Sequence, residues 1–405
     1  MDKTQPRILL LGGSPQQVIA IKKAKEMGIY TILCDYLPDN PGQFVADKFY
    51  NVSTTDVEAV YKVAEQEKVN GILAYASDPA ALPAAIVSER LNLPTNPSSS
   101  VAILGIKYQF RKFLSDNNFA CPQYVTFTPK TSETELKELI SKFSFPIIIK
   151  PTDSSGSKGV TKIESIHHNL DEAITYASQY SHNQILIAEE FIERGFPYVI
   201  GGDIFVKEGK IILFGEMSCL RDNANSALIP IGKKKPSGLD NQQVTIVHKD
   251  LQRIINALNI RFGELNIELL IDKQNRVHFL EIGPRAGGNM IPIQLSDIFK
   301  VDLVKANIAA ALGIHFDLSL EEQEGCFMHY VLHSYEEGEF DKIEIAPEIE
   351  KSVYRKVIYK TEGDKIEFFD GAGKAIGIIF LKFNTIEEME YFCKNHEQLV
   401  KVNLK

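Results

Sequence analysis

The sequence contains no tryptophan and only five cysteines in 405 residues. The cysteines are widely scattered and form no CxxC pair. This spacing argues against a disulfide framework or a zinc site and is typical of reduced thiols in a cytoplasmic protein. A net charge of −9 at pH 7 argues against a general nucleic-acid binder, because such a protein carries a basic stripe. No apolar run approaches the length of a transmembrane helix, and the N-terminus lacks the layout of a signal peptide. We therefore expect a cytoplasmic protein with neither nucleic acid nor membrane as a partner.

What is present is the composition of an ordinary globular protein, with 44% hydrophobic and 24% charged residues and enough length for two or three packed units. The N-terminal part alternates expected strands with expected helices, a rhythm that predicts a parallel sheet covered on both faces. The strands are expected at 7–13, 29–34 and 71–75, and the helices at 16–27, 56–67 and 79–91. The glycine turn at 12–14 lacks the GxGxxG fingerprint, which disfavours a dinucleotide-binding dehydrogenase.

The stretch 264–289 holds the most informative pair of charges. Two β-rich runs, 266–272 and 276–282, flank a polar turn and predict a hairpin. Glu268 and Glu281 interrupt these otherwise apolar strands. A carboxylate within an apolar strand is costly to bury unless a positive charge neutralises it, and Mg²⁺ prefers carboxylate oxygens together with phosphate. The pair therefore predicts a divalent-metal site; the alternative is a half-exposed hairpin with its glutamates on the wet face.

Two loops of small residues are suited to phosphate. Residues 283–288 follow the second strand and combine a tight glycine turn with the guanidinium of Arg285. Upstream, the apolar run 147–149 ends at Lys150 and leads into the loop 153–159. Such a loop exposes consecutive backbone N–H groups that bind phosphate oxygens, and its mobility suits a closing lid. A flexible surface loop is the alternative for 153–159.

Two further segments are candidates for substrate contacts. An apolar strand within 184–192 runs into Glu189 and Glu190, where the chain would offer backbone groups to an adenine edge. Residues 218–235 are interpreted as a long irregular polar loop, and a loop of that length is often functional. Arg221 within it would clamp a substrate carboxylate or merely pin the loop.

The other elements are expected in conventional places. A helix over 101–117 carries Lys107, and the region from about 324 is interpreted as a small α+β cap in which His329 and His333 share a strand face without further zinc ligands nearby. The remaining strands are expected at 198–206, 210–217, 327–333, 353–359 and 376–383, and the helices at 241–258, within 291–312 and at 386–395.

The order of these features resembles the ATP-grasp superfamily of ligases. It runs from the α/β unit through the helix with Lys107, the strand ending at Lys150, the small-residue loop and the strand ending at Glu189 to the acidic hairpin and Arg285. The chain looks most like the branch that contains carbamoyl-phosphate synthase, biotin carboxylase and the carboxylate–amine ligases, over roughly residues 5–315.

The resemblance implies an α/β and α+β multidomain protein. A Rossmann-like parallel α/β domain would cover 1–95, an ATP-grasp domain 96–320 with its lid subdomain at about 120–190, and an α+β cap 321–405. It also implies a role for each site residue. Lys107 and Lys150 would contact the ATP phosphates; Ser154, Ser155, Gly156, Ser157, Lys158 and Gly159 would fold over the β- and γ-phosphates; Glu189, Glu190 and Ile192 would hold adenine; Glu268 and Glu281 would bind Mg²⁺ or Mn²⁺; and Arg285 would stabilise charge on the transferring phosphoryl group or the acyl-phosphate.

The chain departs from the family pattern at three points. The family often has Asn where this chain has Gly283, so a water or substrate oxygen would complete the second metal's shell, or one metal would bind weakly. Pro197 stands where a Glu for the ribose hydroxyls is expected, with Glu193 or Asp203 as candidate substitutes. Finally, neither a biotinyl carrier domain nor a second ATP-grasp half is recognisable.

The resemblance implies a ligase that joins a small carboxylate to an amine through an acyl-phosphate, with release of ADP and phosphate. Substrate choice would lie in the 218–235 loop, at Arg221 and near Glu216. One alternative is a bicarbonate-activating carboxylase or an enzyme like carbamoyl-phosphate synthase. Another is a non-catalytic ATP-binding regulatory module, which Gly283 and Pro197 favour. Because the family is often dimeric, a homodimer remains open.

Overall fold

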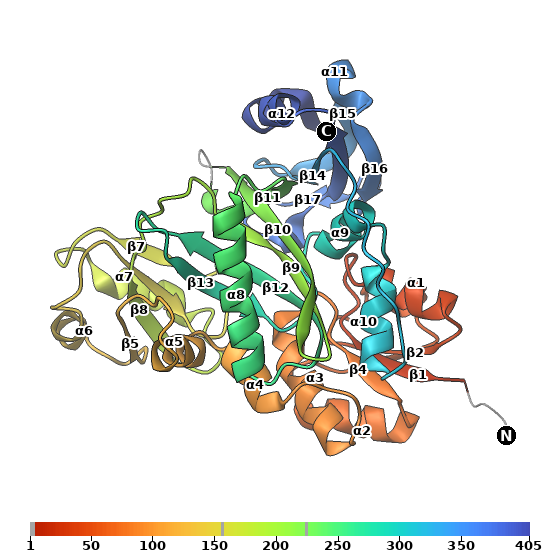
Figure 1. Ribbon diagram of the computed structural model, residues 1–405, viewed down its shortest axis with the longest axis horizontal. Helices are drawn as coiled ribbons and strands as arrows, with labels where there is room; N and C mark the ends of the chain where they lie inside the picture. The colour runs from red at the N-terminus through yellow and green to blue at the C-terminus, as the bar shows by residue number, and fades with distance from the viewer. Residues whose placement is uncertain (1–4, 155–157, 223–225) are drawn as a thin grey trace. The chain divides into compact units, whose positions relative to one another are not determined.

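The computed structural model describes residues 5–154, 158–222 and 226–405. Figure 1 follows the course of the chain, which divides into two compact units. The first unit consists of Met1–Val101, Ile200–Ile267 and Gly283–Lys405, and the second of Ala102–Val199 and Glu268–Ile282. All five cysteines are free, as their spacing predicts. Within the described ranges, no helix is both long and apolar enough to cross a membrane.

The N-terminal part of the first unit is built on a parallel four-stranded sheet in the order β3-β2-β1-β4. Its elements are β1 (Arg7–Leu11), α1 (Val18–Glu26), β2 (Tyr30–Asp35), η1 (Pro41–Phe44), β3 (Lys48–Asn51), α2 (Val57–Glu67), β4 (Gly71–Leu73) and α3 (Asp78–Arg90). Every strand and helix expected here is present, because the apolar runs are buried on both faces of the sheet. The additional edge strand β3 has the short, partly polar sequence KFYN, which lacks such a run.

The second unit contains an antiparallel four-stranded sheet in the order β5-β8-β6-β7. Helices α6 and α7 supply apolar side chains such as Leu136 and Ala173 to its core. The elements of the region, including α4, which leads into the unit, are α4 (Ser98–Gly105), α5 (Lys107–Asp116), β5 (Tyr124–Phe127), α6 (Glu133–Leu139), β6 (Ile147–Pro151), β7 (Thr161–Ile163), α7 (Leu170–Ser178) and β8 (Leu186–Glu190).

The prediction of a single helix over 101–117 is wrong, since the helix is interrupted between α4 and α5. Ile106 has φ −110° and ψ 111°, which is extended backbone. The break makes Lys107 the first residue of α5, where its backbone N–H donates to Thr152 O at 2.9 Å. The apolar pattern runs through both helices and therefore gave no sign of the interruption.

The largest sheet has eight strands in the order β13-β12-β9-β10-β11-β14-β18-β16. Helix α8 lies along β10 (Figure 1), and a separate three-stranded sheet has the order β17-β15-β19. The elements are β9 (Ile200–Lys207), β10 (Lys210–Asp222), β11 (Ser226–Lys235), α8 (Asn241–Ala257), β12 (Phe262–Ile271), β13 (Val277–Gly283), α9 (Ile291–Phe299), α10 (Leu303–Ala311), β14 (Cys326–Leu332), β15 (Gly338–Ile345), α11 (Pro347–Glu350), β16 (Val353–Ile358), β17 (Lys365–Ile366), η2 (Ala372–Lys374), β18 (Gly377–Phe383), α12 (Ile386–Leu399) and β19 (Val400–Leu404).

The irregular loop expected at 218–235 is also wrong, because β10 and β11 form a paired hairpin there. The two strands are antiparallel, and β11 pairs with β14 on its other side. The three lysines at the end of this segment are buried, since their aliphatic stems lie in the sheet, and two of them pair with carboxylates. Lys235 contacts Glu216 at 2.9 Å, and Lys234 pairs with Glu390.

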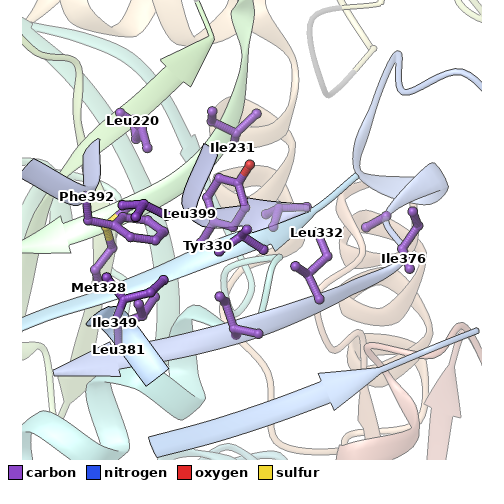
Figure 2. Close-up of a cluster of buried hydrophobic side chains, with 14 of the residues drawn as sticks. Leu220, Ile231, Met328, Tyr330, Leu332, Ile349, Ile376, Leu381, Phe392 and Leu399 are labelled. Carbon is purple, nitrogen blue, oxygen red and sulfur yellow. The ribbon is translucent and has the colours of Figure 1, made fainter. Parts of the chain in front are cut away.

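The C-terminal strands β14, β18 and β16 continue the large sheet. Side chains from β10, β11, β14, β18 and α12 gather in one buried cluster, which Figure 2 shows around Tyr330. Leu220, Ile231, Leu381 and Phe392 belong to it. The hydrophobic positions expected in the cap therefore pack against strands that precede it in the chain.

Candidate active site

The acidic hairpin has the predicted form. β12 and β13 are neighbours in the sheet, and Glu268 lies on the first and Glu281 on the second. The turn between them closes with a hydrogen bond from Asp272 N to Arg276 O at 3.1 Å, and Asn275 takes the left-handed conformation with φ 61°. Asparagine is among the residues that adopt this conformation most readily, which explains why the polar turn occurs here.

Lys107 brings three predicted parts of the site together in the second unit. Its Nζ lies 3.6 Å from Glu281 Oε2 and donates a hydrogen bond to Ser154 O. The lysine is placed by its position at the start of α5, and Ser154 by the end of β6. A cation, a carboxylate predicted to bind metal and the start of the small-residue loop therefore meet at one point.

A second group of charges is buried one helical turn away. Arg111 is fully buried, and its Nε donates to Glu189 Oε2 at 2.9 Å. Its Nη1 donates to the carbonyls of Phe279 and Leu280 on β13, each at 3.2 Å. Lys150 Nζ donates to the other oxygen of Glu189. The Glu189 carboxylate thus neutralises only one of the two buried cations, Arg111 and Lys150. This cluster therefore keeps a net positive charge that an anionic ligand would offset.

These contacts shift the pKa values of the group. Burial lowers the pKa of Lys150 to about 8, and the neighbouring charge of Arg111 acts in the same direction against the attraction of Glu189. Burial alone would raise the pKa of Glu189, but the charges of Arg111 and Lys150 hold it at about 2. Glu189 is therefore ionised at neutral pH, whereas Lys150 loses its proton only about one pH unit above neutrality.

The sequence did not single out Arg111. A cation on a helix is usually solvated, and Arg111 was indistinguishable from its neighbours on that ground. The available signal was its spacing, because residues four apart on a helix share a face and Lys107 is four positions earlier. Once α5 begins at Lys107, both cations project from the same side of one short helix.

The small-residue loop is described at its two ends. Ser154 Oγ donates to Lys158 O at 3.0 Å, and Gly159 has φ 73°, a conformation that favours glycine. Ser155, Gly156 and Ser157 lie outside the described residues. The predicted adenine segment begins at the end of β8, where Glu190 N donates to Gln123 O at 3.0 Å and the Glu190 carboxylate accepts from Ser144 N at 2.7 Å. Ile192, two residues beyond the strand, is half-buried.

The residues present fit a divalent cation that is shared with a phosphate. The Glu281 side chain is 33% exposed, and the described part of the chain offers it no hydrogen bond beside the contact with Lys107. The described residues contain no group of three His, Cys, Asp or Glu side chains that would hold a metal alone. Glu268 and Glu281, on neighbouring strands, would therefore need oxygens from a ligand to complete a metal's shell, which suits Mg²⁺ bound to a nucleotide.

The other predicted residues belong to the first unit. Arg285 Nη2 donates to Asp78 Oδ2 at 2.6 Å, and Asp78 was not identified from the sequence. Glu216 forms its ion pair with Lys235 on the adjacent part of the β10–β11 hairpin. Arg221 lies on β10 opposite Pro230, at a point where the pairing of β10 with β11 is irregular, so a strand rather than a loop carries it.

The two candidate ribose ligands differ in how far the structure engages them. Asp203 is fully buried and accepts from Asn266 Nδ2 at 2.7 Å and from Gly287 N at 2.8 Å. Glu193 is engaged in an ion pair with Lys273.

His329 lies buried against Gln294, and burial lowers its pKa to about 3. Because it is fully buried and its pKa is lowered, His329 is a neutral core residue at pH 7.

Comparison with known proteins places this geometry in a family. The family model described as carbamoyl-phosphate synthase L chain, ATP binding domain, matches residues 107–319. A carbamoyl phosphate synthase large chain from Thermoanaerobacter pseudethanolicus is 23% identical over 331 residues, which is 76% of this chain but only 29% of that protein. A formate-dependent phosphoribosylglycinamide formyltransferase from Bacteroides thetaiotaomicron is 25% identical over 76% of this chain and 77% of its own length.

A solved structure shares the fold over the whole chain. The L-amino acid ligase from Bacillus licheniformis superposes with a TM-score of 0.80 at 18% identity, covering 100% of both chains. The family match covers more than half of this chain and includes both cation-bearing elements and the acidic hairpin. The chain therefore belongs to the family of the carbamoyl-phosphate synthase L chain ATP-binding domain, within the ATP-grasp superfamily.

Proposed function

We propose that the chain is an Mg²⁺- and ATP-dependent carboxylate–amine ligase. The observation that carries this proposal is the position of Lys107, which contacts both the Glu281 carboxylate and the start of the small-residue loop. Phosphoryl transfer depends on positioning and on neutralising charge rather than on a protein nucleophile. Lys107 and Lys150, the excess positive charge beside Glu189 and the acidic hairpin supply those requirements in one unit.

The reaction would proceed in two steps. An oxygen of the substrate carboxylate attacks the γ-phosphorus of ATP, and the bond from that phosphorus to the bridging oxygen of ADP breaks, which yields an acyl-phosphate. The nitrogen of the amine then attacks the acyl carbon; the carbon–oxygen bond to phosphate breaks, the nitrogen loses a proton, and an amide forms. Lys107 and Lys150 would neutralise phosphate oxygens, and Arg285 would offset charge on the transferred group.

Glu268 and Glu281 would hold Mg²⁺. The ion would supply charge neutralisation at the phosphate oxygens. Glu281 would accept the ion at the side of its carboxylate that Lys107 leaves open. Substrate selection would fall to Arg221 and the Glu216–Lys235 pair, because all three residues lie on the β10–β11 hairpin.

The first test is ADP and phosphate release from Mg²⁺–ATP in the presence of pools of small carboxylic acids and amines. The names of the similar proteins point to formate and L-amino acids as the first acids to include. We expect release to require one acid together with one amine. Release with bicarbonate alone would instead establish a carboxylating reaction. Tight ATP binding without release in any pool would favour a non-catalytic binding module.

Nucleotide binding should depend on the proton of Lys150. In the free protein the pKa of Lys150 is lowered to about 8, and a bound phosphate would raise it by favouring the charged form. The affinity for a non-hydrolysable ATP analogue should therefore be constant below pH 8. Above it, affinity should fall by up to roughly tenfold per pH unit, while binding takes up a proton. Calorimetry in two buffers of different ionisation enthalpy measures that uptake.

The matched control is Lys150→Met. This variant should bind the analogue more weakly at pH 7 and show neither the decline above pH 8 nor the proton uptake. Uptake that persists in Lys150→Met would assign the titration to another group and contradict the lowered pKa of Lys150.

A further inference from the structure

The guanidinium of Arg285 is held by a residue from the N-terminal α/β part of the first unit. Asp78 is the first residue of α3, and its Oδ2 accepts from Arg285 Nη2 at 2.6 Å. Arg285 Nη1 also donates to Ala286 O at 3.0 Å. The Arg285 side chain is 10% exposed and that of Asp78 25% exposed, so the pair is largely shielded from water. A charge-assisted contact of this kind restricts a side chain that otherwise has many rotamers.

Gly283 makes the room for this pair. A Cβ added at Gly283 would lie 3.0 Å from Asp78 Oδ1, 3.2 Å from Arg285 Cζ and 3.4 Å from Arg285 Nε. The two shorter separations are tighter than most contacts of a real Cβ atom, so any side chain at 283 would push on both partners at once. The glycine that looked like a lost metal ligand in the sequence is therefore the residue that accommodates the carboxylate of Asp78.

The backbone of the Arg285 turn is fixed independently of Asp78. Asn266 N donates to Arg285 O at 3.0 Å, and Gly287 N donates to Asp203 Oδ2 at 2.8 Å. Asn289 N, at the end of the turn, donates to Gln16 Oε1 at 2.6 Å. Loss of the Asp78 carboxylate would accordingly remove the charged contact of the guanidinium while leaving the turn in place.

From these contacts we infer that Asp78 is a positioning residue that orients Arg285 for phosphoryl transfer, and that Gly283 is required for this arrangement. The inference rests on the proposed ligase function for its kinetic consequence. Asp78 need not touch the substrate, because its effect passes through the guanidinium. It also reverses an expectation: placing Asn at 283, as the family pattern suggests, should disturb Arg285 rather than improve the site.

The kinetic test uses the full chain with Mg²⁺–ATP and the acid and amine that support ADP release. Asp78→Asn keeps the shape of the side chain and removes its charge. It should lower kcat by roughly 10- to 100-fold, as expected when a group is misplaced near the reacting atoms, while KM for ATP stays within about twofold. Asp56→Asn is the matched control. Like Asp78, Asp56 is an aspartate at the start of a helix in the N-terminal part of the chain, where it caps α2 by accepting a hydrogen bond from Ala59 N. It should leave both constants unchanged.

A double-mutant cycle separates positioning from general damage. Gly283→Ala should lower kcat on its own, because the new methyl group displaces the ion pair. In the Asp78→Ala background the same substitution should have little further effect, since the Asp78–Arg285 pair that the methyl group would displace is already lost. Additive losses, or Asp78→Asn with wild-type kcat, would overturn the inference.

A measurement without turnover keeps this inference distinct from the ligase proposal. In protein labelled at arginine, the side-chain NMR signals of Arg285, assigned with Arg285→Lys, should show slow rotation of the guanidinium in the wild type and faster rotation in Asp78→Asn. Unchanged rotation would refute the positioning role. If the wild type releases no ADP with any substrate pair but the rotation responds, the ligase function fails while the role of Asp78 in holding Arg285 stands.

Discussion

Glu281→Gln is expected to abolish ATP-dependent turnover, with a loss of roughly 10²–10³-fold or more, while the protein remains folded. The substitution preserves the shape of the side chain but removes the charge that would hold Mg²⁺ at the transferred phosphate. Turnover is measured as ADP release, and folding as the far-UV circular dichroism spectrum and the thermal midpoint. The fold should survive because the Glu281 side chain is 33% exposed and lies 3.6 Å from Lys107, too far for a strong hydrogen bond.

A comparison variant isolates the effect of the charge. Glu164→Gln removes an exposed carboxylate that pairs with Lys162 in the same unit, at a distance of 2.9 Å. Such surface pairs contribute little, so turnover should be unchanged. If Glu281→Gln retained near-normal turnover at saturating Mg²⁺, Glu281 would not be a metal ligand, and the acidic hairpin would be a structural feature.

Glu189→Gln is expected to lower the free energy of unfolding by about 3–5 kcal/mol, because it leaves Arg111 and Lys150 buried without their shared counter-charge. Urea denaturation measures the change. Replacing Arg111 by Met in the same chain should recover part of the loss, since only one buried cation then remains. Glu190→Gln is the control, because the Glu190 carboxylate accepts one hydrogen bond from Ser144 N and should cost no more than about 1.5 kcal/mol.

The cluster of Glu189, Arg111 and Lys150 should also make the stability of the protein depend on pH in the acid range. The pKa of Glu189 is lowered from 4.5 to about 2 in the folded protein, so its contribution to stability is complete above pH 4.5 and is lost as the pH falls toward 2. Glu189→Gln should remove this part of the pH dependence. A Glu189→Gln variant with wild-type stability at pH 7 and the same acid transition would show that the two cations are neutralised by other groups.

Much of the candidate site could be proposed from the sequence because charges within or at the end of apolar strands leave a strong local signal. Glu268 and Glu281 interrupt apolar runs, and Lys150 terminates one, so each stands out from its neighbours in the sequence. The hairpin joining β12 to β13 followed from its alternation and its turn. What brings Lys107 within 3.6 Å of Glu281, in contrast, is the extended backbone at Ile106, which side-chain periodicity does not reveal.

The errors have a shared physical origin in long-range pairing. Residues 218–235 are polar enough to suggest a loop, yet hydrogen bonds to β14 and carboxylates such as Glu216 and Glu390 make them a strand pair. Arg111 and Asp78 are ordinary exposed-looking residues until distant segments supply their partners. The local sequence shows which side chains carry charge, but it does not show which distant residue each charge contacts. Asp78 and Arg285, for example, are more than a hundred residues apart in the chain.

The route of the chain between its units has a consequence for dissection of the protein. The second unit consists of Ala102–Val199 together with Glu268–Ile282, and β12 and β13 each pass through a unit boundary. An excised fragment covering only 102–199 would lack both carboxylates of the hairpin and the carbonyls of Phe279 and Leu280 that receive Arg111. The second unit is therefore not a removable module, because a returning segment of the chain completes its fold.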